Sequence, residues 1–178
     1  MEKFIWHEEN LPKGRKPERV HAVLVTKDGR MLLRYKNGSP LKVTGGHIDP
    51  EDIDMCSAVA REVLEEIDCK IDKCDFIGYL EYINEAENVH EIWARMVARV
   101  TEILPAQPDP ACKDIWTYGR VLEPIEKARE EEVVPAELTE AMRGVLDAAI
   151  RAAQEKGYFE GAMNTQTEVL NVEEHIKR

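Results

Sequence analysis

The sequence has no long hydrophobic run. No segment approaches the roughly 20 apolar residues that a helix needs to cross a bilayer. The first nine residues, Met1 to Glu9, also lack the apolar core of a secretory signal. We therefore expect a cytoplasmic protein that does not interact with a membrane.

Cysteine is scarce, and its spacing is uninformative. The four cysteines, Cys56, Cys69, Cys74 and Cys112, form no C-x-x-C pair and have no histidine at zinc-finger spacing. In a reducing compartment such residues act as small apolar side chains. We expect neither a disulfide nor a structural zinc site.

Basic residues are outnumbered. Lysine and arginine total 24 against 35 aspartates and glutamates, which gives a net charge of -11. Phosphate backbones attract basic surfaces, so this balance counts against binding of a nucleic-acid polymer. It does not exclude small phosphate compounds, because a metal ion bound to acidic side chains reverses the local charge.

The remaining composition is that of a globular protein. The 178 residues are 43% hydrophobic and 33% charged, enough for one domain with a sizeable core. Residues 158–178 are polar and show no clear periodicity. We expect a single domain over residues 1–157 and a C-terminal tail or arm over residues 158–178.

The order of predicted elements is that of an α+β fold. Two apolar runs, residues 20–26 and 31–35, predict a hairpin that turns at Asp28-Gly29. A short extended piece at residues 41–44 leads into a helix at residues 55–68, whose apolar residues recur at helical spacing. The other expected elements are strands over residues 76–83, 89–100 and 114–122, a proline-rich connection over residues 104–113, and a helix from Pro135 to Gly157.

The predicted helix at residues 55–68 carries an unusual concentration of negative charge. Glu62 has Glu65 and Glu66 at i+3 and i+4, so the three carboxylates project from neighbouring positions. Each like-charged pair costs roughly 0.2–0.5 kcal/mol on an open helix. The cluster needs either free solvation or a cation, and hard divalent ions such as Mg²⁺ prefer oxygen ligands.

Two glycines precede this helix. Gly45 and Gly46 permit a tight turn and a close backbone approach that a side chain would prevent. We expect either a plain turn or a turn that presents backbone groups to a bound ion and to phosphates. The following loop carries His47, expected at the surface, and three further acidic residues that could supply metal ligands: Asp49, Glu51 and Asp52.

Residues 61–66, Arg-Glu-Val-Leu-Glu-Glu, resemble the centre of the Nudix box, G-x5-E-x7-R-E-U-x-E-E-x-G-U, where U is apolar. Gly46 stands where that box begins. Asp52 replaces the box glutamate, and eight residues rather than seven separate it from Arg61. After the helix, Asp68 replaces the box glycine and Cys69 the last apolar residue.

The resemblance covers about residues 18–155 and implies a mixed sheet sandwiched between helices. It implies an enzyme that uses Mg²⁺ or Mn²⁺ to hydrolyse the phosphoanhydride bond of a nucleoside diphosphate linked to another group. The implied metal ligands are Glu62, Glu65, Glu66 and the carbonyl of Gly46, with Gly45 and Gly46 close to the bound ion and phosphates. Arg61 is implied to orient a carboxylate, and Glu62, Glu65 and Arg61 are the implied catalytic residues. Glu62 either shares the metal or accepts the proton of the attacking water, and the identity of the base, which varies within the family, is left open.

Family members often recruit a further glutamate from outside the box, and the aromatic residues of this chain could stack on a base. For any one candidate, a surface charge or core packing is the simpler interpretation. The candidate glutamates are Glu81, Glu85, Glu87, Glu91, Glu131 and Glu132, and the candidate aromatic residues are Tyr79, Tyr82, Trp93, Trp116 and Tyr118.

Two other functions remain open at this point. The altered loop near Asp52 and the loss of glycine at Asp68 favour a Nudix-fold domain that binds or senses a nucleotide with little or no turnover. The retained Glu62, Glu65 and Glu66 favour the enzyme. A structural α+β protein without a metal is the third reading. Dimers are common in the family, and the C-terminal arm could support one.

Overall fold

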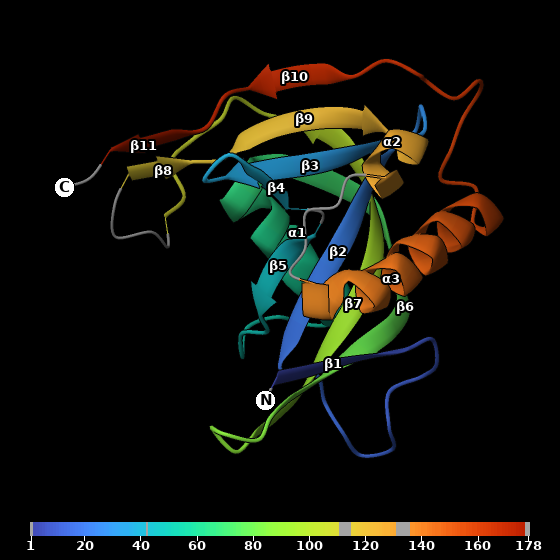
Figure 1. Cartoon of the computed structure of the whole chain (residues 1–178). Coiled ribbons are helices and arrows are strands. Elements are labelled where there is room, and N and C mark those ends of the chain that lie inside the picture. The colour runs from blue at the N-terminus through green and yellow to red at the C-terminus, as the bar shows by residue number, and fades with distance from the viewer. Residues whose placement is uncertain (1, 42, 111–114, 131–135, 177–178) are drawn as a thin grey trace.

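The computed structural model describes residues 2–41, 43–110, 115–130 and 136–176. A mixed β-sheet lies between helices on its two faces (Figure 1), which confirms the predicted α+β sandwich. The bounds of the elements are β1 Glu2–His7, β2 Arg19–Thr26, β3 Arg30–Lys36, β4 Ser39–Leu41, β5 Thr44–His47, α1 Met55–Ile67, β6 Cys69–Asn84, β7 Val89–Ile103, β8 Ile115–Thr117, β9 Gly119–Pro124, α2 Ile125–Glu130, α3 Ala136–Glu155, β10 Glu168–Asn171 and β11 Glu174–Ile176.

Within the described part of the chain, the main sheet runs in the order β1-β6-β7-β2-β3-β9-β10, with β5 added beside β2 and β4 beside β3. The pairing of β2 with β7 is parallel, and the other pairings of this sheet are antiparallel. A second, two-stranded sheet joins β8 to β11. The long hairpin of β6 and β7 and the central strand β2 therefore form the middle of the sheet.

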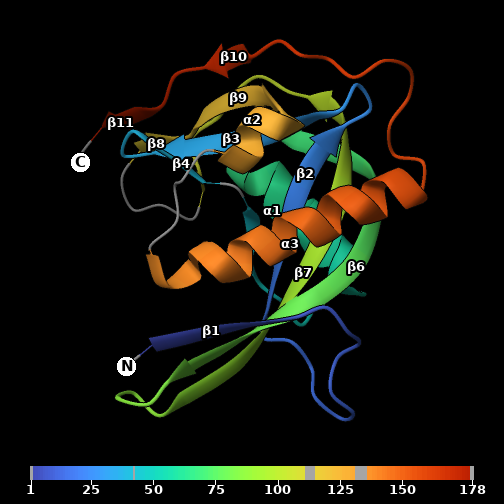
Figure 2. The ribbon, with the colours of Figure 1, turned by 45° about the vertical axis from the view of Figure 1, so that its right-hand side comes forward.

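The two faces of the sheet bury separate cores because alternate residues of a strand point to opposite sides. On one face, Val20 and Leu24 of β2 pack in a cluster with Val59 and Val63 of α1. On the other face, residues of β2 and β7 such as Val97 pack with α3. Figure 2 shows α3 lying across this second face, with α1 behind the sheet. A strand covered on both sides has to be apolar throughout, as most of β2 is.

Helix α1 is capped at both ends, by side chains at its start and by a left-handed residue at its end. Asp54 accepts a hydrogen bond from the backbone N–H of Ser57, and the Ser57 side chain accepts one from the backbone of Asp54, which forms a capping box. At the other end, Asp68 adopts the left-handed conformation, with φ 52° and ψ 47°. The observed helix, Met55–Ile67, confirms the predicted one to within a residue.

The expected turn at Gly45-Gly46 is wrong. Both glycines lie in strand β5, where Gly45 pairs with His21 and Gly46 with Val20. A Cβ on Gly45, whose φ is 152°, would stand 2.0 Å from the carbonyl oxygen of Val20. The glycines permit two strands to approach closely, which is a role of glycine within sheets.

Several elements are longer or more numerous than the sequence indicated. The predicted strands at 76–83 and 89–100 extend to Cys69–Asn84 and Val89–Ile103 because their polar residues alternate with buried ones. The predicted strand at 114–122 divides into β8 and β9. Strands β1, β10 and β11 and the six-residue helix α2 were not predicted. The predicted helix start at Pro135 lies outside the described residues, whereas α3 ends at Glu155, just before Gly157.

The C-terminal segment after α3 runs back along the opposite edge of the sheet from β1 (Figure 1). Near its start, Tyr158 is fully buried and donates a 2.6 Å hydrogen bond to Asp75. Farther along, β10 pairs with β9, and β11 pairs with β8. The arm expected over residues 158–178 thus contributes one core residue and one strand of the main sheet.

No helix in the described ranges is long and apolar enough to cross a membrane. Cys56, Cys69 and Cys74 are free thiols, and Cys112 lies outside the described residues.

Candidate functional site

The carboxylate of Glu62 lies directly against strand β5. A Cβ built on Gly46 would stand 2.7 Å from Glu62 Oε1 and 2.8 Å from Glu62 Oε2. Both distances are far below a normal contact, so the carboxylate occupies the space that a side chain at position 46 would fill. Glu62 of helix α1 can therefore contact the strand only because position 46 has no side chain.

Glu66, one helical turn after Glu62, reaches the same strand. Its Oε2 accepts a 3.2 Å hydrogen bond from the backbone N–H of Gly45, and its Oε1 pairs with Arg34 at 2.8 Å. Burial raises the pKa of the Glu66 carboxyl to about 7, although Arg34 and Gly45 oppose this effect. The neighbouring Glu62 carboxylate raises the pKa further. Glu66 is thus a desolvated carboxyl held beside a second one.

Glu65 is the most accessible glutamate of the three. Its side chain is 44% exposed, against 13% for Glu62 and 15% for Glu66. Its Oε2 lies 3.7 Å from Nη1 of Arg61, which is a longer separation than in the other ion pairs of the helix glutamates. The structure therefore brings Glu62 and Glu66 together at Gly45-Gly46 and leaves Glu65 at the solvent boundary.

Arg61 links the helix to the preceding loop. Its Nε and Nη2 donate to the two carboxylate oxygens of Asp52 at 3.2 and 2.9 Å, and its Nη1 donates to Glu62 at 2.8 Å. Nη2 also donates to the carbonyl of His47 at 2.9 Å. A paired, charge-assisted contact of this kind fixes orientation as well as distance. Arg61 accordingly connects the loop, the strand end and Glu62.

Asp52 therefore faces Arg61. Its side chain is 6% exposed, and hydrogen bonds from Arg61 lower the pKa of its carboxyl against the opposing effect of burial. Asp49 contacts the same guanidinium at 3.5 Å and is half exposed, and Glu51 is exposed. The expected ligand role of the loop carboxylates is thus replaced, for Asp52, by an ion pair with Arg61.

The glutamates proposed from outside the helix have other partners. Glu81 pairs with His7 and His90, Glu85 pairs with Lys3, and Glu91 accepts from the indole N–H of Trp93. Glu87 is exposed in the β6–β7 turn, and Glu131 and Glu132 lie outside the described residues.

The aromatic candidates form two pairs, and Tyr79 lies apart from both. Tyr82 and Trp93 stack at 4.8 Å between ring centroids on the α3 face of the sheet. Tyr118 lies under the guanidinium of Arg34 at 4.7 Å, with Trp116 beside it at 6.5 Å. Tyr79 is buried, stacks on His7 and donates to Glu9.

The donor chemistry at Gly45-Gly46 fits a hard divalent cation. Glu62 and Glu66 offer carboxylate oxygens, and the adjoining strand offers backbone carbonyls, which are the ligands that Mg²⁺ and Mn²⁺ prefer. In the side-chain arrangement described here, Arg61 and Arg34 neutralise the two carboxylates. No group of three or more His, Cys, Asp or Glu side chains within the described ranges is gathered closely enough to hold a metal.

Several site residues were not found from the sequence. Arg34, His21 and Arg95 lie in strands that are otherwise largely apolar and close to the site. The only available signal was a polar residue inside an apolar run, which is informative because buried charges need partners. Arg34 has such a partner in Glu66.

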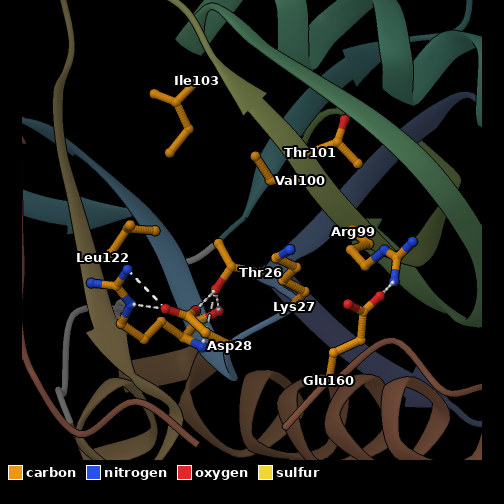
Figure 3. Close-up of a pocket in the computed structure, with 10 residues that line it drawn as sticks. Thr26, Lys27, Asp28, Arg99, Val100, Thr101, Ile103, Leu122 and Glu160 are labelled. Atoms are coloured by element: carbon orange, nitrogen blue, oxygen red, sulfur yellow. Dashed lines mark hydrogen bonds and ion pairs between the residues drawn. The ribbon is translucent and has the colours of Figure 1, made fainter.

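A separate cavity of about 470 Å³ lies at the other end of β2, around the β2–β3 turn. Figure 3 shows two of its side-chain contacts: Arg99 donates to Glu160, and Asp28 accepts from Thr26. Arg30 is likewise paired with Asp28. These internal pairs stabilise the end of the sheet, and the cavity does not include the glutamates of α1.

Comparison with known proteins identifies the family of the chain. The family model described as the NUDIX domain matches residues 15–142. A comparison with curated protein sequences found no match.

Three solved structures share the fold. A mutant form of the Bacillus subtilis pyrophosphohydrolase BsRppH has a TM-score of 0.63 at 18% identity, over 88% of this chain and 93% of that one. A structure described as ADP compounds hydrolase gives 0.55 at 18% identity, over 81% and 77%. A NUDIX hydrolase from Nitrosomonas europaea gives 0.52 at 17% identity, over 77% and 90%. At these identities the likeness is one of fold.

Proposed function

The chain belongs to the Nudix family, and we propose that it is a Mg²⁺-dependent hydrolase. Its proposed substrate is a nucleoside diphosphate linked to another group, and the bond cleaved is the phosphoanhydride. The structural neighbours described as a pyrophosphohydrolase and an ADP compounds hydrolase support this class of substrate.

The observation that carries the proposal is the convergence of Glu62 and Glu66 on Gly45-Gly46. If the three glutamates were only surface charges, the helix would not bury two of them against a strand. Glycine would also not be needed opposite Glu62. Partly buried carboxylates are retained at a cost in stability, and such costs concentrate at functional sites.

Each residue has a proposed role. Glu62, Glu65, Glu66 and the carbonyl of Gly46 would hold Mg²⁺ or Mn²⁺, which supplies neutralisation of phosphate charge and a more acidic water when bound. Arg61, anchored by Asp52, positions the carboxylate of Glu62. Glu62 and the more exposed Glu65 are the two candidates to accept the proton of the attacking water.

The two departures from the Nudix box are accommodated by the structure. Asp68 adopts the left-handed conformation that the box glycine would supply, and aspartate tolerates it better than most residues. Asp52 reaches Arg61 through the longer loop and makes a paired contact. These features weaken the case for a binding domain without turnover, because neither departure disorganises the glutamates.

The test is a substrate panel with Mg²⁺ or Mn²⁺: nucleoside triphosphates, ADP-ribose, diadenosine polyphosphates and nucleotide sugars, with the released phosphate products measured. Glu62→Gln and Glu66→Gln should each lower kcat/KM by about 100-fold or more, since loss of an essential electrostatic group costs several kcal/mol of transition-state stabilisation. Glu102→Gln, an exposed residue paired with Lys70, should leave turnover unchanged.

The same panel separates the alternatives. Turnover that disappears in Glu62→Gln and persists in Glu102→Gln supports the hydrolase. Tight nucleotide binding with no turnover of any panel member would instead support a nucleotide-binding or regulatory domain. In an active enzyme, a Glu65→Gln variant that lowers kcat without changing the Mg²⁺ requirement would assign Glu65 as the base.

A further inference from the structure

Two basic side chains lie behind strand β5, the strand that Glu62 and Glu66 contact. His21 of β2 is the register partner of Gly45, and Arg95 of β7 is the register partner of His21. Val23 and Val97 lie two residues after His21 and Arg95 in the same strands, so they share a face of the sheet with them. Both valines pack in the core beneath α3. His21 and Arg95 therefore occupy the α3 face of the sheet, one and two strands away from β5.

Arg95 is buried, and it has no counter-ion among the residues that the structure describes. Only 3% of its surface is exposed, and its Nε and Nη1 have no hydrogen-bond partner among the described residues. A buried arginine usually has hydrogen-bond acceptors for its N–H groups, as Arg120 does. Arg120 is 4% exposed and donates to Asn171 and to the carbonyls of Ile67 and Leu104. A buried charge that lacks such partners is costly, and burial alone lowers the pKa of Arg95 to about 9.

The described groups beside Arg95 bring no negative charge to it. His21 is half-buried, and its Nδ1 atom is buried and has no partner within the described ranges. Burial and then the positive charges of Arg95, Arg34 and Arg19 lower the pKa of His21 well below its usual value. In a chain of net charge -11, a local excess of buried positive charge is unexpected.

The nearby carboxylates are committed to other groups. Glu66 pairs with Arg34 on the other face of the sheet, and Glu91 accepts from Trp93 and lies 3.6 Å from Arg19. Neither appears among the groups that shift the pKa of Arg95. Compensation from these carboxylates is thus not available to Arg95.

Trp93 provides only partial compensation. The guanidinium carbon of Arg95 lies 5.8 Å from the indole centroid, and that of Arg19 lies 5.4 Å from it. Such cation–π contacts favour the charge but leave the N–H groups of a guanidinium free, because those groups donate in its own plane. Arg95 therefore retains donors that suit an anionic oxygen.

We propose that Arg95, with His21 beside it, binds a phosphate oxygen of the substrate without a metal between them. The identification of that anion as a substrate phosphate rests on the proposed function. His21 is the register partner of Gly45, whose N–H donates to Glu66, so a phosphate bound at His21 and Arg95 lies on the opposite face of the sheet from the glutamates, across the edge strand β5. In the cavity of Figure 3, by contrast, both arginines are paired: Arg30 with Asp28 and Arg99 with Glu160.

The test uses the full-length protein in EDTA, with ADP and inorganic pyrophosphate as separate probes in titration calorimetry. Arg95→Met keeps the length of the side chain and removes its charge and donors. It should weaken binding of both probes at least 10-fold and raise the Tm of the unliganded protein, because an uncompensated buried charge has been removed. An arginine with only a structural role would lower the Tm when replaced.

Arg30→Met is the matched control. Arg30 is also buried, but it is paired with Asp28 and Glu168 at the far end of β2. Its replacement should lower the Tm and leave both affinities unchanged. Binding of pyrophosphate as well as ADP identifies the phosphate group as the recognised part, and binding of ADP alone identifies a nucleotide phosphate; either supports the site if Arg95→Met abolishes it.

The inference fails if Arg95→Met lowers the Tm and leaves the affinities unchanged, or if the wild type binds neither probe. These results are independent of turnover. Hydrolysis by the wild type with unaltered binding in Arg95→Met would overturn the role of Arg95 alone. Absence of hydrolysis with Arg95-dependent binding would overturn the proposed activity and leave the phosphate site in place.

Discussion

Glu62 occupies the volume that a side chain at Gly46 would need. The 2.7 Å separation between a Cβ at position 46 and Glu62 Oε1 means that one of the two has to move if Gly46 is replaced. The backbone of Gly46 is not in the left-handed region, so the conflict concerns the Glu62 carboxylate and not the strand. Strand β5 and helix α1 are thus fitted to each other through this pair.

Gly46→Ala should therefore impair activity far more than folding. The displaced carboxylate is the end of a flexible side chain, so the free energy of unfolding should fall by only about 1 kcal/mol. Loss of Glu62 from its position should lower kcat/KM by about 100-fold. The measurements are denaturant unfolding and steady-state kinetics on the best substrate of the panel.

A double-mutant cycle checks the cause. If Gly46→Ala acts through Glu62, adding it to Glu62→Gln should produce little further loss of activity, because both changes remove the same interaction. Fully additive losses would show that position 46 acts by another route.

We expect the replacement of Asp68 by asparagine to leave the stability nearly unchanged and its replacement by alanine to lower the stability. Its φ of 52° disfavours residues with a plain Cβ, and its carboxylate accepts a 2.8 Å hydrogen bond from the backbone of Gln107. Asp68→Ala should lower the free energy of unfolding by about 1–2 kcal/mol. Asp68→Asn keeps both the conformational tolerance and an acceptor, so its stability should stay within about 0.5 kcal/mol of the wild type in urea unfolding. Equal losses for the two variants would contradict this assignment.

Asp52 should matter more than Asp49, although both contact Arg61. Asp52 is almost fully buried and makes the paired contact, whereas Asp49 is half exposed at 3.5 Å. Asp52→Ala should lower the free energy of unfolding by about 2 kcal/mol and reduce kcat about 10-fold, since Arg61 loses its anchor. Asp49→Ala should change the stability by less than about 0.5 kcal/mol. Unfolding and kinetics on both variants give the comparison, which fails if Asp49→Ala is the more damaging.

Much of the fold follows from local sequence patterns. Helix α1 was predictable because Val59, Val63 and Ile67 recur at helical spacing, and the β2–β3 hairpin because Asp28-Gly29 separates two apolar runs. Strand β5 was mistaken for a turn because glycine pairs usually mark turns, and only the partner strand reveals the close approach that they permit. Helix α2, with six residues, is shorter than two helical turns and leaves little periodicity to detect.

The candidate site also combines residues that are close in the sequence with residues that only the fold brings near. Arg61 and the three glutamates lie within six consecutive residues, so their proximity is a property of one helix. Arg34, His21 and Arg95 come from three strands, and their meeting depends on the sheet order. The sequence offers Asp52 only as one of three possible metal ligands, because its contact with Arg61 depends on the conformation of the intervening loop.

The metal-free protein should lose stability as pH rises toward neutrality. The pKa of Glu66 is raised from its ordinary value of 4.5 to about 7, chiefly by burial, so the folded state binds this proton more tightly than the unfolded chain. The contribution is therefore fully present below about pH 4.5 and is lost as pH rises through about 7. The total effect is about 3 kcal/mol.

Urea unfolding in EDTA at about pH 5 and about pH 8 measures this effect. Glu66→Gln should flatten the pH dependence, because glutamine is neutral throughout, and should be more stable than the wild type at the higher pH. The exposed control Glu102→Gln should retain the wild-type slope. An identical slope in all three proteins would show that Glu66 ionises normally.

The central claim, that Glu62 and Glu66 hold a divalent cation against Gly45-Gly46, can be tested directly by crystallography with Mn²⁺. Crystals soaked at a Mn²⁺ concentration that supports turnover should show an anomalous difference peak within coordination distance of both carboxylates. The same peak should be absent from Glu62→Gln crystals. A wild-type crystal in which Arg61 and Arg34 keep their pairs with Glu62 and Glu66, and in which Mn²⁺ binds elsewhere or not at all, would contradict the account.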